Sequence, residues 1–345
     1  MLIYLVTRHN SSPIDWYLEL WGHSLPMPVE VIYYEDLPKR RSLPVGTYIF
    51  SDLERLDGPL LTVAGQVWQQ LAHHDRPMAL LNHPYRSMRR YELLRTLREQ
   101  GINAFDIYRL TEHRRPQRFP VFIRGENDHR GSLTGLLNTA EELEAAIADL
   151  AERGENPYDK VITEYCNVAD ADGVFRKYSA FVVGDRVLPL HVAGHRHWVV
   201  KTRRLETDAI AEDHAALLRD NPHADQIRQI FSLARIAYGR IDYGFLGDRL
   251  QVWEINTNPS IVLPANQRAT DATMDQFRRS LADAFAAIAP PPRDRPAPLT
   301  LTWPRPDQDL GKGFIERTSD WLPGLSTPQK AQLRRVLRRI KQRLR

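Results

Sequence analysis

The sequence has almost no cysteine and no long hydrophobic run. Its 345 residues include one cysteine, Cys166, which excludes an internal disulfide and a metal site of clustered thiolates. No apolar stretch approaches the roughly 20 residues that span a bilayer as a helix. The apolar residues 1–7 are too few for a signal peptide and lack its basic leader. These absences predict a protein of the reducing cytoplasm.

The rest of the composition is ordinary for a globular protein. Hydrophobic residues make up 42% and charged residues 26% of a chain long enough for two or three domains. The net charge of +4 is unevenly placed, because residues 321–345 hold eight basic side chains and no acidic one. The rest of the chain is therefore mildly acidic.

A basic amphipathic helix is predicted at the C-terminal end, behind a Pro-rich linker at residues 289–298. Thr327 and Pro328 form a typical helix start. Such a helix could pack on the body of the protein, bind an acidic partner or an anionic membrane surface, or bind nucleic acid. Packing on the body is the interpretation that we favour most, and nucleic-acid binding is the one that we favour least. The protein is therefore expected in the cytoplasm, with peripheral binding to a membrane as the alternative.

Local patterns predict two folded regions ahead of the linker. Residues 1–77 alternate short strands with a helix, which is typical of a small α/β domain. Residues 78–288 predict a larger domain of mixed α/β and α+β class. The expected helices are 60–73, 87–100, 139–153, two within 208–237, and 271–288; the expected strands are 2–6, 29–34, 47–51, 78–81, 119–124, 161–165, 175–183, 186–192 and both arms of a hairpin over 239–255.

The hairpin carries the strongest functional signal. Glu254 and Asn256 are two residues apart on one strand, so they point to the same face. Pairing across the turn brings Asp242 beside them. Three oxygen ligands on one face suit a hard cation such as Mg²⁺, which usually also binds substrate phosphates. The alternative is a polar, solvated strand face, which the apolar flanking residues disfavour.

The runs from Gly239 to Asp242 and from Glu254 to Pro259 resemble the metal-binding signature of the ATP-grasp superfamily, especially D-alanine–D-alanine ligases and the glutamate ligases that modify ribosomal proteins. The resemblance implies an ATP-grasp fold of two subdomains over residues 78–288. It also implies ATP as substrate and Mg²⁺ as cofactor, with Mn²⁺ as the alternative ion. In these roles Asp242, Glu254 and Asn256 would hold the metal, and Arg240 would be the catalytic residue beside the acyl phosphate.

Three earlier segments resemble the nucleotide-binding parts of the same family. Residues 119–124, followed by a loop with three glycines, resemble the strand and loop that cover the phosphates, although an arginine stands where the family usually has lysine. Residues 161–166 resemble the adenine hinge, and residues 177–185 a charged strand. The resemblance therefore implies nucleotide contacts from Arg124, Glu164, Tyr165, Cys166 and Lys177.

Each of these assignments has a plainer alternative. Arg124 could be a surface arginine that closes a strand, and Lys177 could be solvated. Arg89 and Arg90, ahead of a helix, resemble basic residues that touch phosphate in the family, but a solvated helix face explains at least one of them.

Candidate substrate residues follow the second predicted hairpin. His191, His197 and Lys201 would line a pocket for an anionic substrate, with Trp198 as its apolar wall. Asn258 lies in the segment that resembles the family's substrate loop. A zinc site is disfavoured, because no acid or cysteine is locally paired with the histidines.

The predicted function is an ATP- and Mg²⁺-dependent carboxylate–amine ligase that acts through an acyl phosphate and releases ADP. One alternative is an ATP-grasp kinase that phosphorylates a hydroxyl. Another is an ATP-binding module of low turnover, tethered by its basic tail. The sequence contains no convincing nucleophile with an adjacent base, which agrees with catalysis by positioning and electrostatics.

Overall fold

The computed structural model describes residues 1–76, 78–128, 131–199, 205–261, 272–289 and 297–303. The chain divides into two compact units, Met1–Leu299 and Thr300–Arg345. The first unit holds all elements described below, apart from the end of β13. The predicted boundary near residue 77 lies inside this unit and stays a prediction, and the predicted C-terminal helix lies outside the described residues.

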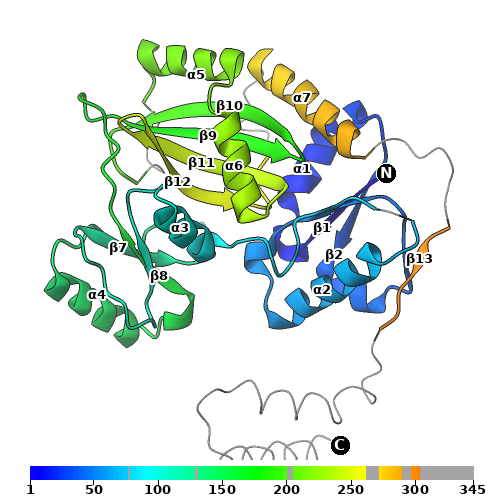
Figure 1. Ribbon diagram of the computed structural model, residues 1–345, viewed down its shortest axis with the longest axis horizontal. Helices are drawn as coiled ribbons and strands as arrows, with labels where there is room; N and C mark the ends of the chain where they lie inside the picture. The colour runs from blue at the N-terminus through cyan, green and yellow to red at the C-terminus, as the bar shows by residue number, and fades with distance from the viewer. Residues whose placement is uncertain (77, 129–130, 200–204, 262–271, 290–296, 304–345) are drawn as a thin grey trace, which may run out of the picture. The chain divides into compact units, whose positions relative to one another are not determined.

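A parallel four-stranded sheet forms the start of the chain, in the order β2-β1-β4-β5 (Figure 1). Its central strand β1 is buried along its whole length, as parallel strands usually are. The elements of this region are β1 (Leu2–Val6), α1 (Ser12–Trp21), β2 (Val29–Tyr33), β3 (Ser42–Leu43), β4 (Thr47–Phe50), α2 (Gly58–Ala72) and β5 (Leu80–Leu81).

A three-stranded antiparallel sheet follows, in the order β6-β8-β7. The side chain of Thr139 caps the helix behind it by accepting a hydrogen bond from the N–H of Glu142. The carboxylate of Glu142 binds the N–H of Asn138 instead of Thr139 (2.6 Å). The elements are α3 (Arg90–Glu99), β6 (Ile107–Arg109), β7 (Val121–Gly125), α4 (Ala140–Glu152) and β8 (Lys160–Glu164).

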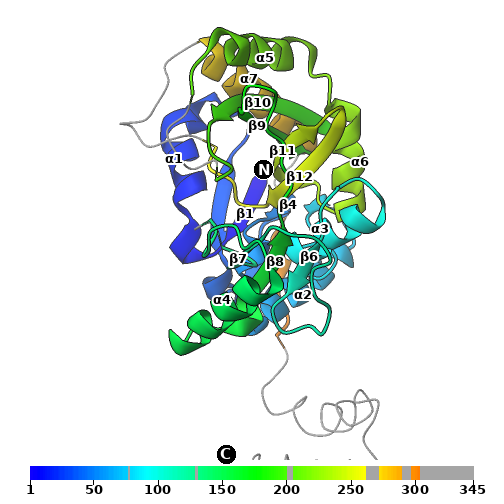
Figure 2. The same cartoon turned by 90° about the vertical axis from the view of Figure 1, so that its left-hand side faces the viewer.

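A four-stranded antiparallel sheet completes the first unit, in the order β10-β9-β11-β12. Its two hairpins turn at Gly184 and Gly247, both at a φ of +60°, which glycine adopts without steric cost. Figures 1 and 2 place α5 and α7 beside β10 and well away from α4. The elements are β9 (Phe175–Val183), β10 (Arg186–His195), α5 (Asp208–Asp220), α6 (Ala224–Ala234), β11 (Tyr238–Leu246), β12 (Arg249–Asn256), α7 (Ala272–Ile288) and, at the boundary of the units, β13 (Leu299–Thr300).

The two faces of this sheet pack against different partners. Ala180 and Val182 of β9 join a core with α3 and α6. Phe181 and Val183, which point the other way, join a core with β1, α1 and α7. The second core therefore ties the four-stranded sheet to the parallel sheet. Five short 3₁₀ helices complete the list of described elements: Arg8–Asn10, Gly22–Ser24, Tyr34–Lys39, Leu53–Arg55 and Pro157–Asp159.

Most predicted elements are confirmed to within a few residues, and several are corrected. The strand expected at 78–81 is limited to Leu80–Leu81, the helix expected from residue 87 begins at Arg90, and β10 continues past residue 192 to His195. The helix α1 and the strand β6 were not predicted. Among the described residues, no helix combines the length and apolar character that crossing a membrane requires.

Candidate active site

The hairpin of β11 and β12 sets the geometry of the site. Its register places Asp242 opposite Glu254, which confirms the predicted pairing across the turn, and it also places Arg240 opposite Asn256. On the other side of β11, Ser179 of β9 lies opposite Asp242. Directly opposed residues point to the same face, so the two carboxylates lie side by side. A bulge follows Asp242 in the register, and it allows Trp253 and Glu254 to line the same cavity.

Asp242 is buried among cations. Its carboxylate accepts a hydrogen bond from Ser179 Oγ (2.8 Å) and lies 3.1 Å from Lys177 Nζ and 3.2 Å from Arg240 Nε. Burial alone would raise the pKa of this carboxyl, but Arg240 and Lys177 more than offset it, and the pKa lies below its ordinary value. Asp242 is therefore ionised at neutral pH.

Glu254 is paired with Arg90, a residue that is only 7% exposed. The same guanidinium donates to the carbonyl oxygens of Gly125 (3.3 Å), Glu126 (2.6 Å) and Asp128 (3.0 Å). Arg90 thus fastens the start of the glycine loop to the carboxylate of β12. The sequence marked Arg90 only as one of two basic residues ahead of a helix, and the structure excludes the solvated alternative for it.

Arg124 of β7 is a second buried cation in the site. Burial and the neighbouring Arg90 lower the pKa of Arg124 to about 10. Its Nε is buried and has no hydrogen-bond partner among the residues that the structure describes. A buried donor without a partner is costly, so this position suits an anionic ligand.

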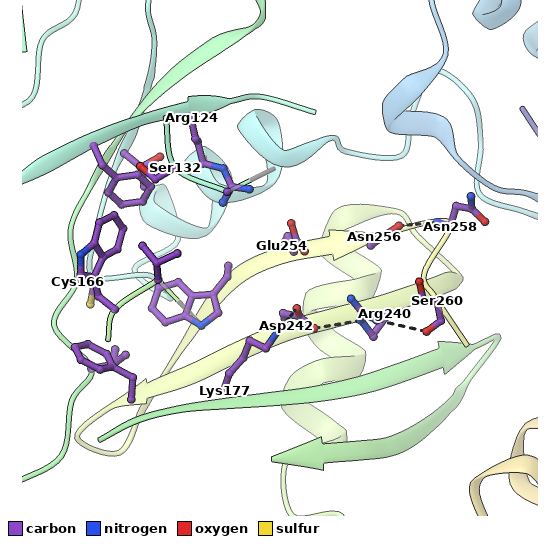
Figure 3. Close-up of a pocket in the computed structure, with 18 of the residues that line it drawn as sticks. Arg124, Ser132, Cys166, Lys177, Arg240, Asp242, Glu254, Asn256, Asn258 and Ser260 are labelled. Carbon is purple, nitrogen blue, oxygen red and sulfur yellow. Dashed lines mark hydrogen bonds and ion pairs between the residues drawn. The ribbon is translucent and has the colours of Figure 1, made fainter. Parts of the chain in front are cut away.

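A cavity of about 580 Å³ joins these groups, which is within the usual size of small-molecule sites. Figure 3 shows aromatic side chains near Cys166 at one end, Lys177, Asp242 and Glu254 in the middle, and Asn258 at the other end. At the aromatic end Trp198 packs on Phe122 (4.9 Å between ring centroids). The cavity is therefore apolar at one end and strongly charged at its centre.

No family model and no protein of curated function matches the sequence. Solved structures do match: D-alanine–D-alanine ligase from Bacillus anthracis has a TM-score of 0.51 and 14% identity, covering 83% of this chain and 95% of that one. The chain has an ATP-grasp fold. Further matches are the ATP-grasp ligase PsnB with Mg and ADP (TM-score 0.49, 13% identity, 82% and 97% covered) and the D-cycloserine synthetase DcsG (0.47, 15%, 82% and 99%).

Ten of the predicted site residues line this one cavity of the ATP-grasp fold, although their roles stay predictions. His191 and His197 are not among its lining residues, and Lys201 lies outside the described residues. Those that line it are Arg124, Glu164, Tyr165, Cys166, Lys177, Arg240, Asp242, Glu254, Asn256 and Asn258.

Two of the expected contacts at the aromatic end differ in detail. Trp198 was expected to wall the acceptor pocket, but it lies 5.9 Å from the Tyr165 ring, at the predicted adenine end. The buried carboxylate of Glu164 accepts hydrogen bonds from Tyr108 Oη (3.0 Å) and Arg118 Nε (3.1 Å). This carboxylate is therefore bound within the protein through residues that lie 56 and 46 positions away in the sequence.

The donor set fits Mg²⁺ bound together with phosphates. In the described part of the chain, no three His, Cys, Asp or Glu side chains cluster as metal ligands. Mg²⁺, however, commonly uses only one or two carboxylates and completes its shell with phosphate and water. Asn256 Oδ1 accepts the N–H of Asn258 (2.8 Å), and an amide oxygen retains a second lone pair. The Nε of Arg124, which has no partner in the described part of the chain, fits the accompanying anion.

Proposed function

We propose that this protein is an ATP- and Mg²⁺-dependent ligase that joins a carboxylate to an amine. The observation that carries the proposal is the pair of opposed carboxylates, Asp242 and Glu254, ringed by cations within one cavity that has an aromatic end. The likeness to a D-alanine–D-alanine ligase supports the reaction class.

The two ends of the cavity suit the two ends of a nucleotide. Tyr165 and Cys166, with Phe122 and Trp198, offer an apolar slot for a base. Arg124 and Lys177 lie toward the charged centre and would bind the phosphates. Asp242, Glu254 and Asn256 would hold Mg²⁺, which when bound neutralises phosphate oxygens.

The proposed reaction has two steps. A carboxylate oxygen of the acid attacks the γ-phosphorus, the bond to the β-phosphate oxygen breaks, and an acyl phosphate and ADP form. The amine then attacks the acyl carbon, loses a proton, and expels phosphate to leave an amide. Arg240, 3.2 Å from Asp242 and lining the cavity, would stabilise the negative charge that develops on the acyl oxygen. The site acts mainly by orientation and charge.

ADP release with Mg²⁺-ATP and a panel of carboxylic acids, with and without amines, tests the proposal. We expect release that depends on both substrates, and a loss on the order of 100-fold in Asp242→Asn. Asp248→Asn, at the exposed turn of the same hairpin, is the matched control and should leave the rate unchanged. Hydroxyl phosphorylation without any amine would indicate a kinase, and tight ATP binding without turnover would contradict both enzyme functions.

A further inference from the structure

The end of the cavity farthest from the aromatic slot is built by the first part of the chain. Its lining residues there are His9, Asn10, Ser12, Pro13, Trp16 and Arg55, and none of these is acidic. Asn258 joins this end to the hairpin, because its Nδ2 donates to the carbonyl oxygen of Asn10 (2.8 Å) and its Oδ1 accepts from Tyr4 Oη (3.1 Å). Arg55 therefore places a positive charge at this end of the cavity, away from the proposed phosphate site.

Arg55 is presented by a buried and strained turn. Asp52 is fully buried and has a φ of +56°. This value lies in the left-handed region, which residues other than glycine rarely adopt. Its carboxylate accepts hydrogen bonds from Thr7 Oγ1, from Asn10 Nδ2 (3.1 Å) and from Arg55. Strained conformations held by several contacts cluster at ligand sites.

The same turn is fastened to the loop that follows the proposed metal ligands. The N–H of Leu53 donates to Thr257 Oγ1 (3.0 Å), and the N–H of Thr257 donates to Glu54 Oε1 (3.3 Å). The hydroxyl of Thr257 also donates to Glu54. Arg55 is therefore held in a fixed position relative to Asn256.

The chemistry of Arg55 favours a carboxylate ligand. In the described part of the chain Asp52 is the acid paired with Arg55, and this pair uses Nη1 of the guanidinium. A guanidinium has five N–H donors, and its planar fork matches a carboxylate. Arg240 already serves the proposed reacting group, so Arg55 would serve a different anion.

We propose that Arg55 binds a carboxylate that a substrate carries and that the reaction does not consume, so that the product keeps it. The proposal rests on the ligase function for its context. The spared carboxylate could belong to the acid, which would then be a dicarboxylate, or to the amine, which would then be an amino acid. Both sources share the same recognition by Arg55.

Kinetics of ADP release by the full chain distinguish these sources. One arm compares glutarate with its monomethyl ester as the acid, and the other compares β-alanine with β-alaninamide as the amine. We expect wild-type protein to prefer the free carboxylate in one arm, with a KM lower by roughly 10- to 100-fold. Arg55→Gln should lose that preference and keep its KM for ATP, and Arg55→Lys should restore part of it. If Arg55→Gln raised the KM equally for the charged substrate and for its ester or amide, the proposal would be overturned.

A binding measurement that involves no turnover tests this proposal independently of the ligase function. Calorimetry with Mg²⁺-ADP present measures glutarate and β-alanine on wild-type protein, Arg55→Gln and the control Arg8→Gln, an exposed arginine paired with Asp36 outside the cavity. We expect Arg55→Gln alone to weaken one of these ligands at least tenfold. If both bind Arg55→Gln as they bind wild type, or neither binds wild type, the carboxylate site is refuted, whatever the outcome for ADP release.

Discussion

At the scale of single residues, the site contains two buried cations, Arg90 and Arg124, of which Arg90 is paired with Glu254. Arg90 lies close enough to disfavour the charge of Arg124, whose buried Nε has no hydrogen-bond partner among the described residues. Charge that is unfavourable in the folded protein becomes useful when a polyanion binds. The unpaired charge of Arg124 is what a phosphate site would be expected to provide.

Replacing Arg124 should therefore stabilise the folded protein and weaken its binding of nucleotide. A pKa below the ordinary value means that folding disfavours the charged form, so at neutral pH the charge lowers the free energy of unfolding. We expect Arg124→Met to raise this free energy by on the order of 1 kcal/mol, and to weaken Mg²⁺-ADP binding at least tenfold. Denaturant unfolding and calorimetry measure the two effects, with Arg153→Met, an exposed arginine of the α4 C-terminus, as control. Lower stability together with unchanged nucleotide affinity would contradict the assignment.

At the scale of elements, the central hairpin depends on close approach of its two strands. A Cβ added at Gly239 would lie 2.8 Å from the carbonyl oxygen of Asn256 and 3.2 Å from Ile255 Cγ2. The first of these contacts is with backbone, which cannot move without shifting β12. Gly239 is therefore needed to keep Arg240 opposite Asn256.

We expect Gly239→Ala to destabilise the protein by roughly 1 to 3 kcal/mol and to lower ADP release, because β12 moves away from Asp242. Gly58→Ala is the matched control, since a Cβ there meets nothing within 4 Å. Thermal unfolding and the ADP assay together measure the effect. Equal behaviour of the two variants would show that the strand spacing is not critical.

How far the sequence predicted these elements depended on the range of the contacts involved. The hairpins were predictable because glycine turns and alternating side chains are local signals. The helix α1 also carries a local signal, Pro13 in its first turn. The bulge beside Asp242 has no such signal. The pairing of Arg90 with Glu254 joins residues 164 apart, and the left-handed Asp52 is set by contacts with Thr7 and Asn10. Contacts between residues far apart in the sequence therefore determine the geometry of much of the site.

At the scale of the whole molecule, the proposed chemistry belongs to the first unit, and the sequence carries a separate run of basic residues at 321–345. The cavity is lined by residues of the parallel sheet region, the three-stranded sheet and the four-stranded sheet. The eight basic side chains of residues 321–345 lie outside the described residues. We propose that these basic residues determine where the protein is located in the cell, by binding an anionic membrane surface or an acidic partner.

Full-length protein should bind vesicles that contain phosphatidylglycerol at low salt, and release them as salt rises. Basic residues contribute about 1 kcal/mol each at such a surface, so exchanging four arginines for glutamine (Arg334, Arg335, Arg338 and Arg339) should weaken binding by roughly 100-fold or more. Sedimentation with neutral phosphatidylcholine vesicles is the control. Binding that ignores both salt and these substitutions would contradict an electrostatic role.

The most direct test of the central claim follows the oxygen atoms. An acid substrate labelled with ¹⁸O in its carboxylate is turned over with Mg²⁺-ATP and an amine, and the released phosphate is analysed by mass spectrometry. An acyl phosphate mechanism predicts one ¹⁸O transferred to each phosphate, with amide formed in equal amount, and neither product in Glu254→Gln. ADP formation with unlabelled phosphate, or transfer of the γ-phosphate to a hydroxyl, would contradict the account.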